Sequence, residues 1–465
     1  MNPICRQGAG ELARRIANRE LSSVEVVEAH LERIREVNPG VNAIVRVLGD
    51  DALTAARAAD AAVGAGAALG PLHGVPFTIK ENIDVAGLPT TCGVPALANT
   101  IASQDAPVVE RMKAAGAIPI ARTNLPDMGL RMATESTLHG VTRNPWRGDR
   151  TAGGSSGGEA VAIACGMSPI GLGNDLGGSL RNPANACGIA SIRPSAGRVP
   201  HAQQIPASTE MLAMQWMMVQ GPMARTVADV RLTLGVLAGA HPRDPWSVTA
   251  PLQAVEHGGP LRVAVMAHPP GGDCDPKISA IVRKAADVLA NAGYDVVEAT
   301  PPGYEETLKL WERLLATDMT VMAEGMASLG EMVNSVVQAL LRNGNPCQSP
   351  AEFSRLAARR DAIARKWSAF MESHPLLLTP VWTQLPFEHG WDVTKGSNIL
   401  EVARPVLPAN FLGLPSACVP AGFDEASGLP VGVLVTGWRM NDGLCLDAAE
   451  HVQAHCGFET PLDPR

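Results

Sequence analysis

One stretch of the chain, Gly153 to Gly188, decides the fold; it reads GGSSGGEAVAIACGMSPIGLGNDLGGSLRNPANACG. Its glycine-rich start leads into a helix of small residues, EAVAIACGM, and SPIGLGND then has the apolar pattern of a buried strand. The stretch holds three candidate serine nucleophiles, Ser155, Ser156 and Ser179, but no histidine. Because serine needs a base to react at neutral pH, the proton acceptor must come from elsewhere in the chain.

Helices and strands alternate on both sides of this stretch. GVPFTIKENI at 74–83 alternates as a strand that ends near Lys80, and PLRVAVMAH with the following residues to 300 predicts a strand–helix–strand unit. We expect further helices within 10–38 and at 52–66, 105–116, 221–239, 306–345, 350–373 and 442–455, with strands at 117–124 and a hairpin within 415–437. Residues 10–38 are predicted to form two helices, of which the second opens with a capping box of Ser22 and Glu25 and stops at NPG, residues 38–40. The helix at 221–239 is expected to start at Pro222. No linker or repeat interrupts the pattern, so residues 1–465 are predicted to form one α/β domain around a mixed sheet.

The composition excludes several classes of protein. Hydrophobic residues make up 46% of the 465, which is enough for a large core, and charged residues only 18%. The net charge of −8 and the lack of a dense Lys/Arg run argue against nucleic acid as a partner. The nine cysteines are scattered without zinc spacing, and no segment of 18 apolar residues or apolar leader is found. We therefore expect a cytoplasmic protein with no metal and no membrane segment.

Two familiar interpretations of the glycine-rich turn fail on context. Residues 153–157 fit G-x-S-x-G, but the nucleophile elbow follows a buried strand, whereas RNPWRGDRTA at 143–152 is polar and irregular. A phosphate-binding loop would need the G-x-x-x-x-G-K-[ST] pattern, which is absent from the sequence.

Ser179 is the stronger candidate, because two glycines precede it in NDLGGSLRNP. Consecutive N–H groups at 176–179 could converge on one oxygen, as an oxyanion hole requires, and Asp175 and Arg181 could lock the loop as an ion pair. A glycine-rich turn with a capping serine has the same local sequence, so the residues alone leave both interpretations open.

Lys80 is the candidate base, because it ends an apolar strand where an ammonium group is costly. Desolvation lowers the pKa of a lysine and lets it accept a proton near neutral pH. A strand-end lysine that reaches out to solvent would look the same in the sequence. His73 and His139 lie nearby in the sequence and are interpreted as ordinary polar loop residues.

The longer motifs resemble the amidase signature family. These are GVPFTIKENIDVAGLPTTCG, TRNPW, TAGGSSGGEAVAIACG, GNDLGGSLRNPANACGIASIRPSAGRVP and GPMARTVADV, which follow in this order. The resemblance implies a twisted mixed sheet sandwiched by helices, a signature core at about 70–240, and a more variable helical region at about 300–400 that shapes the pocket.

The resemblance also implies a Ser-cisSer-Lys triad. Ser179 would be the acylated nucleophile, Ser155, after a cis peptide bond, the proton carrier, and Lys80 the base, with no cofactor. The remaining expected roles are the oxyanion hole (Leu176, Gly177, Gly178 and Ser179), support of the loop (Ser156, bonded near Asp175, with Asp175 and Arg181) and substrate contacts (Met128, Gly129, Asn174, Met214 and Trp216). Asn174 stands where many members have Thr or Ser.

The expected reaction is hydrolysis of the C–N bond of a small amide, with anilides and carbamates (urethanes) among the possible substrates. Two segments, MLAMQWMMVQ at 211–220 and TLKLWERLLATDMTVMAEGM at 307–326, favour an apolar pocket, although the same residues could simply fill the core. The alternative is the glutaminase subunit of a tRNA-dependent amidotransferase. A non-enzymatic scaffold is a third hypothesis, against which the intact Lys80, Ser155 and Ser179 argue. The chain is expected to act as a monomer or homodimer.

Overall fold

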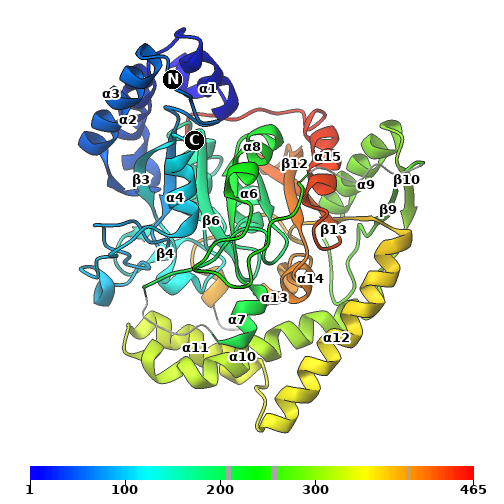
Figure 1. Cartoon of the computed structure of the whole chain (residues 1–465). Helices are drawn as coiled ribbons and strands as arrows, with labels where there is room; N and C mark the ends of the chain where they lie inside the picture. The colour runs from blue at the N-terminus through cyan, green and yellow to red at the C-terminus, as the bar shows by residue number, and fades with distance from the viewer. Residues whose placement is uncertain (206–210, 253–258, 395–396) are drawn as a thin grey trace.

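A computed structural model of the chain describes residues 1–205, 211–252, 259–394 and 397–465. Its centre is an eleven-stranded sheet in the order β1-β3-β2-β6-β8-β7-β12-β13-β11-β9-β10 (Figure 1). The strands are β1 (Ile44–Val47), β2 (Pro76–Lys80), β3 (Ile118–Thr123), β6 (Ile170–Asp175), β7 (Ala190–Arg193), β8 (Val219–Ala224), β9 (Arg262–Val265), β10 (Asp295–Glu298), β11 (Leu376–Pro380), β12 (Ser416–Asp424) and β13 (Leu429–Gly437). A separate two-stranded ribbon joins β4 (Glu135–Ser136) and β5 (Gly140–Val141).

The sheet is mixed, as the sequence predicts. Strand β2 runs parallel to both of its neighbours, β3 and β6, whereas β6 and β8 are antiparallel and β12 and β13 form an antiparallel hairpin. Strands β9 and β10 are parallel and are connected through a helix, which confirms the expected strand–helix–strand unit.

Helices cover both faces of the sheet, and two buried hydrophobic clusters hold them there. On one side lie α2 (Ser23–Val41), α3 (Gly49–Gly64), α5 (Gly157–Ala164), α6 (Arg181–Cys187), α7 (Leu212–Met217), α10 (Tyr304–Ala327), α11 (Glu331–Asn343), α12 (Pro350–Ser373), α13 (Ile399–Val402) and α14 (Leu407–Leu412). On the other lie α1 (Ala9–Ala17), α4 (Pro107–Ala114), α8 (Val227–Leu237), α9 (Pro276–Asn291) and α15 (Asp442–Gln453). This arrangement confirms the predicted sandwich of helices around one mixed sheet.

The expected helix at 221–239 is wrong at its start. Residues up to Ala224 belong to β8, and the helix begins only at Val227, where the Thr226 side chain accepts a hydrogen bond from the N–H of Asp229. Pro222 had suggested the first turn of a helix, but it lies opposite Leu172 in the sheet. Here the pairing with β6 and β7 overrides the local signal.

Helix α2 begins as the sequence predicts and ends later. Ser22 and Glu25 form a reciprocal capping box at its start. The helix continues through Pro39 to Val41 and stops at Asn42, which has a left-handed conformation and donates its N–H to the Asn38 carbonyl at 2.8 Å. The expected stop at Asn38–Gly40 is therefore wrong by a few residues.

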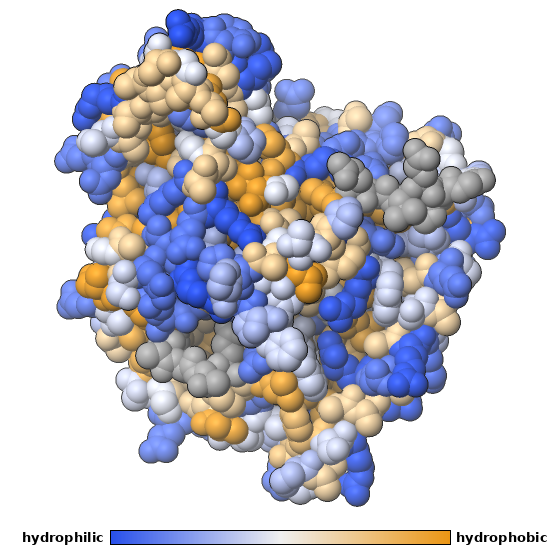
Figure 2. All heavy atoms as spheres, in the orientation of Figure 1, coloured by the Kyte–Doolittle hydropathy of each residue, from blue (hydrophilic) through white to orange (hydrophobic). Residues whose placement is uncertain are grey.

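The described surface exposes few large apolar side chains, and Trp246 and Val321 are the most exposed of them. On the face drawn in Figure 2, polar and apolar residues are intermixed. None of the described helices combines the length and the apolar character that crossing a membrane would require.

Candidate active site

Lys80 is the last residue of β2 and is completely buried. Side chains alternate along the strand, so Phe77 and Ile79 enter the cluster beneath α1 and α8, while Thr78 and Lys80 face α5. Burial lowers the pKa of Lys80 to about 7, even though the negative charges of Asp175 and Glu159 act in the opposite direction. An amine with this pKa is about half neutral near pH 7, and its neutral form can accept a proton.

Two groups contact the Lys80 amine among the described residues. A hydrogen bond of 2.7 Å joins its Nζ to Oγ of Ser155, and a second, of 2.6 Å, is accepted by Oδ1 of Asn174. The amide of Asn174 in turn donates from Nδ2 to Oδ1 of Asn82 at 2.9 Å. Asn174 therefore lies against the candidate base, a position that the sequence analysis did not foresee.

Ser155 follows the expected non-proline cis peptide bond, between Gly154 and Ser155, and is 2% exposed. Gly129 covers its hydroxyl so closely that an added Cβ would lie 3.3 Å from Oγ of Ser155. Ser179 is partly exposed, and its carbonyl accepts a hydrogen bond from the N–H of Ser156 at 3.3 Å. The two serine loops thus lie against each other, and the Ser179 hydroxyl makes no hydrogen bond within the described part of the chain.

Asp175 organises the loop that carries Ser179. Its carboxylate accepts hydrogen bonds from the guanidinium of Arg181 at 3.0 Å and from Nδ2 of Asn410 at 2.7 Å, so the expected ion pair is present. Burial alone would raise the pKa of Asp175, but the charge and hydrogen bonds of Arg181, together with the charge of Arg193, hold that pKa well below its usual range. A permanently ionised Asp175 can therefore anchor this loop.

The same carboxylate changes the expected oxyanion hole. The N–H of Gly178 donates to Oδ1 of Asp175 at 2.8 Å. Because this N–H already has an acceptor, Gly178 is no longer a candidate donor of the oxyanion hole. The amides of Leu176, Gly177 and Ser179 have no hydrogen-bond partner among the described residues. Ser156 supports the loop through its main chain, because its buried hydroxyl has no partner in the described structure and does not bond Asp175 as expected.

A buried carboxyl lies behind Lys80 on the face toward α5. Glu159 accepts hydrogen bonds from the hydroxyls of Thr78 on β2 and Thr123 on β3. Burial raises its pKa to about 7, which these hydrogen bonds and the charge of Lys80 partly offset. Gly171 on β6 makes room for it, since a Cβ there would lie 1.6 Å from Oε1 of Glu159.

Helix α10 forms the wall beside the Ser179 loop. The indole of Trp311 donates from Nε1 to the Leu176 carbonyl at 3.3 Å, and a Cβ added at Gly177 would lie 2.9 Å from the ring. Met214, on α7, donates its N–H to the side chain of Asp318 on α10 at 3.1 Å. Trp311 thus contacts the candidate oxyanion loop, and it lies in the segment 307–326 that the sequence favours as part of an apolar pocket.

The other expected substrate residues are spread around this site. Met128 has a left-handed backbone conformation and donates its N–H to the Cys92 carbonyl at 2.8 Å, next to Gly129. The ring of Trp216 lies 4.8 Å beneath the guanidinium of Arg360 from α12, so its described contacts lie away from the serines. A role for Met128, Met214 and Trp216 in substrate binding remains a prediction.

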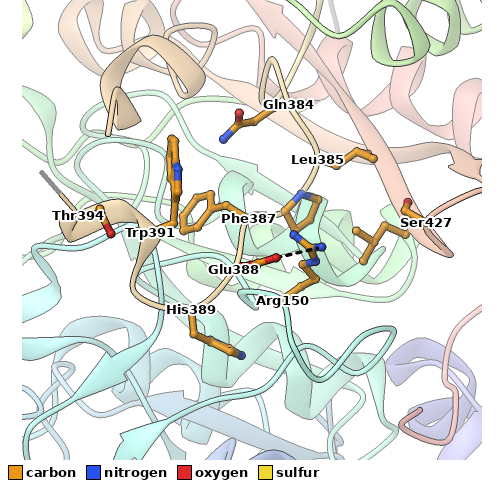
Figure 3. A pocket seen from close by; sticks show the side chains of 11 residues that line it. Arg150, Gln384, Leu385, Phe387, Glu388, His389, Trp391, Thr394 and Ser427 are labelled. Atoms are coloured by element: carbon orange, nitrogen blue, oxygen red, sulfur yellow. Dashed lines mark ion pairs between the residues drawn. The ribbon is translucent and has the colours of Figure 1, made fainter. Parts of the chain in front are cut away.

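A cavity of about 500 Å³ opens beside the segment that leads to Ser155 (Figure 3). Phe387 and Trp391 stand in its wall with ring centroids 5.0 Å apart, and the ion pair between Arg150 and Glu388 crosses it. Trp382 stacks on Phe387 at 5.3 Å and donates to Oδ1 of Asn182 at 2.9 Å, just after the Ser179 loop. The aromatic stack therefore ties this cavity wall to the loop without bringing the cavity to Ser179.

The two histidines considered as alternative bases are engaged elsewhere. Nε2 of His139 lies 2.6 Å from Oε2 of Glu81, and Nε2 of His73 lies 3.0 Å from the Ala59 carbonyl. Neither forms a hydrogen bond with Ser155 or Ser179. Lys80, by contrast, forms a hydrogen bond with Ser155.

A buried neutral amine against one serine, with a second serine on a loop of unpaired amides, is suited to acyl transfer from a carbonyl. Comparisons with known proteins agree: the amidase family model matches residues 25–446. Indoleacetamide hydrolase of Bradyrhizobium diazoefficiens is 41% identical over 98% of this chain and 87% of its own. Acylamidase of Rhodococcus erythropolis is 32% identical over 96% of this chain and 94% of its own.

A solved structure extends this similarity to the fold. The structure of 6-aminohexanoate cyclic dimer hydrolase superposes with a TM-score of 0.87 and 28% identity, covering 99% of both chains. The chain belongs to the amidase family, also called the amidase signature family. It is an enzyme that hydrolyses the C–N bond of amides.

Proposed function

We propose that Ser179 is the nucleophile, Ser155 the proton carrier and Lys80 the base. Neutral Lys80 takes the hydroxyl proton of Ser155, which takes the proton of Ser179 as Oγ of Ser179 bonds to the amide carbon. The C–N bond then breaks, and the leaving nitrogen receives the proton back through Ser155. Water then attacks the acyl group on Ser179, and its proton passes through Ser155 to Lys80. The proton returns through Ser155 to Oγ of Ser179 as the acid is released. The observation that carries this proposal is the 2.7 Å contact between the buried Lys80 amine and Ser155.

The amides of Gly177 and Ser179 are proposed to hold the oxyanion, with Leu176 contributing if its N–H turns inward. Support comes from their lack of partners among the described residues and from the anchoring of the loop by Asp175. Preorganised donors of this kind are commonly worth about 3 kcal/mol of barrier each.

The proposed substrate is a primary amide of an arylacetic acid. The 41% identity to an indoleacetamide hydrolase over nearly the whole chain supports it, as does the indole of Trp311 beside Gly177. Anilides and carbamates have the same reacting carbonyl and remain secondary candidates. The nine cysteines are all free, which supports a reducing compartment, the cytoplasm, as the place of action.

The test has two parts. A fluorophosphonate reagent should label Ser179 alone, located by mass spectrometry, and Ser179→Ala should abolish turnover without changing the unfolding transition. Ammonia release from indole-3-acetamide, phenylacetamide, hexanamide and glutamine then ranks the substrates. Labelling of Ser155 with Ser179 untouched would reverse the two serine roles.

The glutaminase component of a tRNA-dependent amidotransferase remains the second candidate. Relatives that belong to glutamyl-tRNA(Gln) amidotransferases, such as the one from Acidothermus cellulolyticus, are 30–33% identical over more than 90% of this chain. This candidate predicts that glutamine is the preferred substrate and that the isolated chain is poorly active on aryl amides. A preference for arylacetamides over glutamine would exclude it.

A further inference from the structure

We propose that Asn82 and Asn174 form an amide pair that orients the Lys80 amine toward Ser155. They are positioning residues, and the inference rests on the proposed role of Lys80 as the base. A neutral amine has two N–H groups and one lone pair, and only the lone pair can accept the serine proton. What surrounds the two N–H groups therefore decides where the lone pair points.

Asn174 has the right atom in the right place. Its Oδ1 accepts a hydrogen bond from Nζ of Lys80 at 2.6 Å, which occupies one N–H of the amine. In the opposite orientation the side chain would present Nδ2, a donor, and would compete with Ser155 for the lone pair. A carboxamide, unlike the hydroxyl of Thr or Ser, has distinct donor and acceptor ends, so its orientation has to be fixed.

Asn82 supplies that constraint. Its Oδ1 accepts the hydrogen bond from Nδ2 of Asn174 at 2.9 Å, so the donor end of Asn174 points away from the amine. The main chain of Asn82 is held as well, because Nε2 of Gln203 donates to its carbonyl. The arrangement is a chain from Asn82 through Asn174 and Lys80 to Ser155, and its first member is only two residues after the base.

The charged and titratable groups around Lys80 do not orient its amine by hydrogen bonds. Asp175 from β6 and Glu159 from α5 act on it through their charge, and Cys92 lies on the loop after β2. Arg122 from β3 donates to the Lys80 carbonyl at 3.4 Å rather than to its amine. None of these four groups forms a hydrogen bond with Nζ in the described structure, whereas Asn174 and Ser155 do.

Substitution of Asn82 gives the cleanest test, because this residue is partly exposed and its loss should not prevent folding. Asn82→Leu removes the acceptor and should lower kcat about tenfold at constant KM. Asn82→Asp keeps an acceptor for Nδ2 of Asn174 and should restore the kcat plateau at alkaline pH to at least fivefold above that of Asn82→Leu. Asn18→Leu, which removes an exposed asparagine whose side chain bonds only Glu20 among the described residues, is the matched control and should leave kcat unchanged.

Asn174→Asp gives a second, independent readout. A carboxylate beside the amine raises the pKa of Lys80 by about one unit or more, so the acid limb of the kcat profile should move to higher pH and activity should recover on alkalinisation. Equal plateaus for Asn82→Leu and Asn82→Asp, or an unshifted limb in Asn174→Asp, would overturn the proposal. A rise in KM with kcat intact would instead make Asn174 a substrate contact.

The same samples separate this inference from the proposed function. Fluorophosphonate labelling of Ser179 and the inactivity of Lys80→Arg test the triad alone. If these hold while the Asn82 and Asn174 variants behave like wild type, only the amide pair is refuted. If wild-type Ser179 is not labelled, the proposed mechanism fails first.

Discussion

Nζ of Lys80 lies 2.7 Å from Oγ of Ser155, and neither side chain is accessible to more than a trace of solvent. Burial lowers the pKa of Lys80 to about 7. Because only the neutral amine accepts a proton, kcat/KM for an amide should rise with pH through an acid limb near this value. A pH–rate profile on the wild-type enzyme measures the limb directly.

Lys80→Arg should remove nearly all amide hydrolysis at every pH, since a guanidinium stays charged and cannot act as a base. Activated esters should lose less than amides, because their leaving groups need no proton. Amide turnover within about tenfold of wild type, or about 1.4 kcal/mol of barrier, would rule out Lys80 as the base. Substitution of His139 and His73 would then be the next measurement.

The low pKa of Lys80 should also appear in stability. Between its folded value of about 7 and the ordinary value of 10.5, the unfolded chain binds one proton more than the folded chain. The free energy of unfolding therefore gains up to about 1.4 kcal/mol per pH unit from this residue as pH rises. Denaturant titrations at pH 8, 9 and 10 should show the free energy of unfolding of wild type rising with pH relative to that of Lys80→Met. A constant difference would mean that Lys80 is not desolvated as described.

Trp311→Phe tests the wall beside the Ser179 loop. A smaller aromatic ring remains, but the hydrogen bond from Nε1 to the Leu176 carbonyl is lost, a change of about 1 kcal/mol. We expect kcat to fall about fivefold with little change in Tm. Trp367→Phe is the matched control, because the buried Nε1 of Trp367 has no partner to lose among the described residues. Equal kinetic effects of the two substitutions would contradict a role for Trp311 at this loop.

Gly171→Ala tests the packing around Glu159. Its Cβ would lie 1.6 Å from Oε1 of Glu159, so the strand or the carboxyl must move, at a cost of about 2 kcal/mol or more. Thermal unfolding should show a lower Tm. Gly235→Ala, on the exposed side of α8 with no described atom within 4 Å of the added Cβ, should instead stabilise by about 0.5–1 kcal/mol. An unchanged Tm for Gly171→Ala would show that the site behind Lys80 is loosely packed.

The motifs around Lys80, Ser155 and Ser179 could be predicted from the sequence because each is local. A glycine-rich turn, an apolar strand with a terminal lysine and a helix of small residues are visible within about ten positions. The alternation of strands and helices predicted one α/β domain around a mixed sheet, and the resemblance to the amidase signature family implied the sandwich of helices. Pro222 was misinterpreted because its place in the sheet depends on partners in β6 and β7, which no local pattern reveals.

The parts of the site that escaped prediction are contacts over long sequence distances. Trp311 meets Leu176 across 135 positions, and Asn410 meets Asp175 across 235. The hydrogen bond from the Gly178 N–H to Asp175 joins residues only three positions apart, yet it depends on a loop conformation that many glycine-rich sequences can adopt. Asn82 could have been singled out as a neighbour of the candidate base, since it lies only two residues after Lys80 in the sequence.

The position of Asn410, 235 residues after Asp175 in the sequence, has a consequence for when the enzyme becomes active during its synthesis. A ribosome that has made 240 residues has already supplied Lys80, Ser155 and Ser179, but not the amide that holds Asp175 or strand β12, which pairs with β7. The nascent chain should therefore stay inert until its last quarter emerges, although its reactive groups are complete long before. Activity would begin only near the completion of synthesis, so a truncated product released early carries the triad residues without a working site.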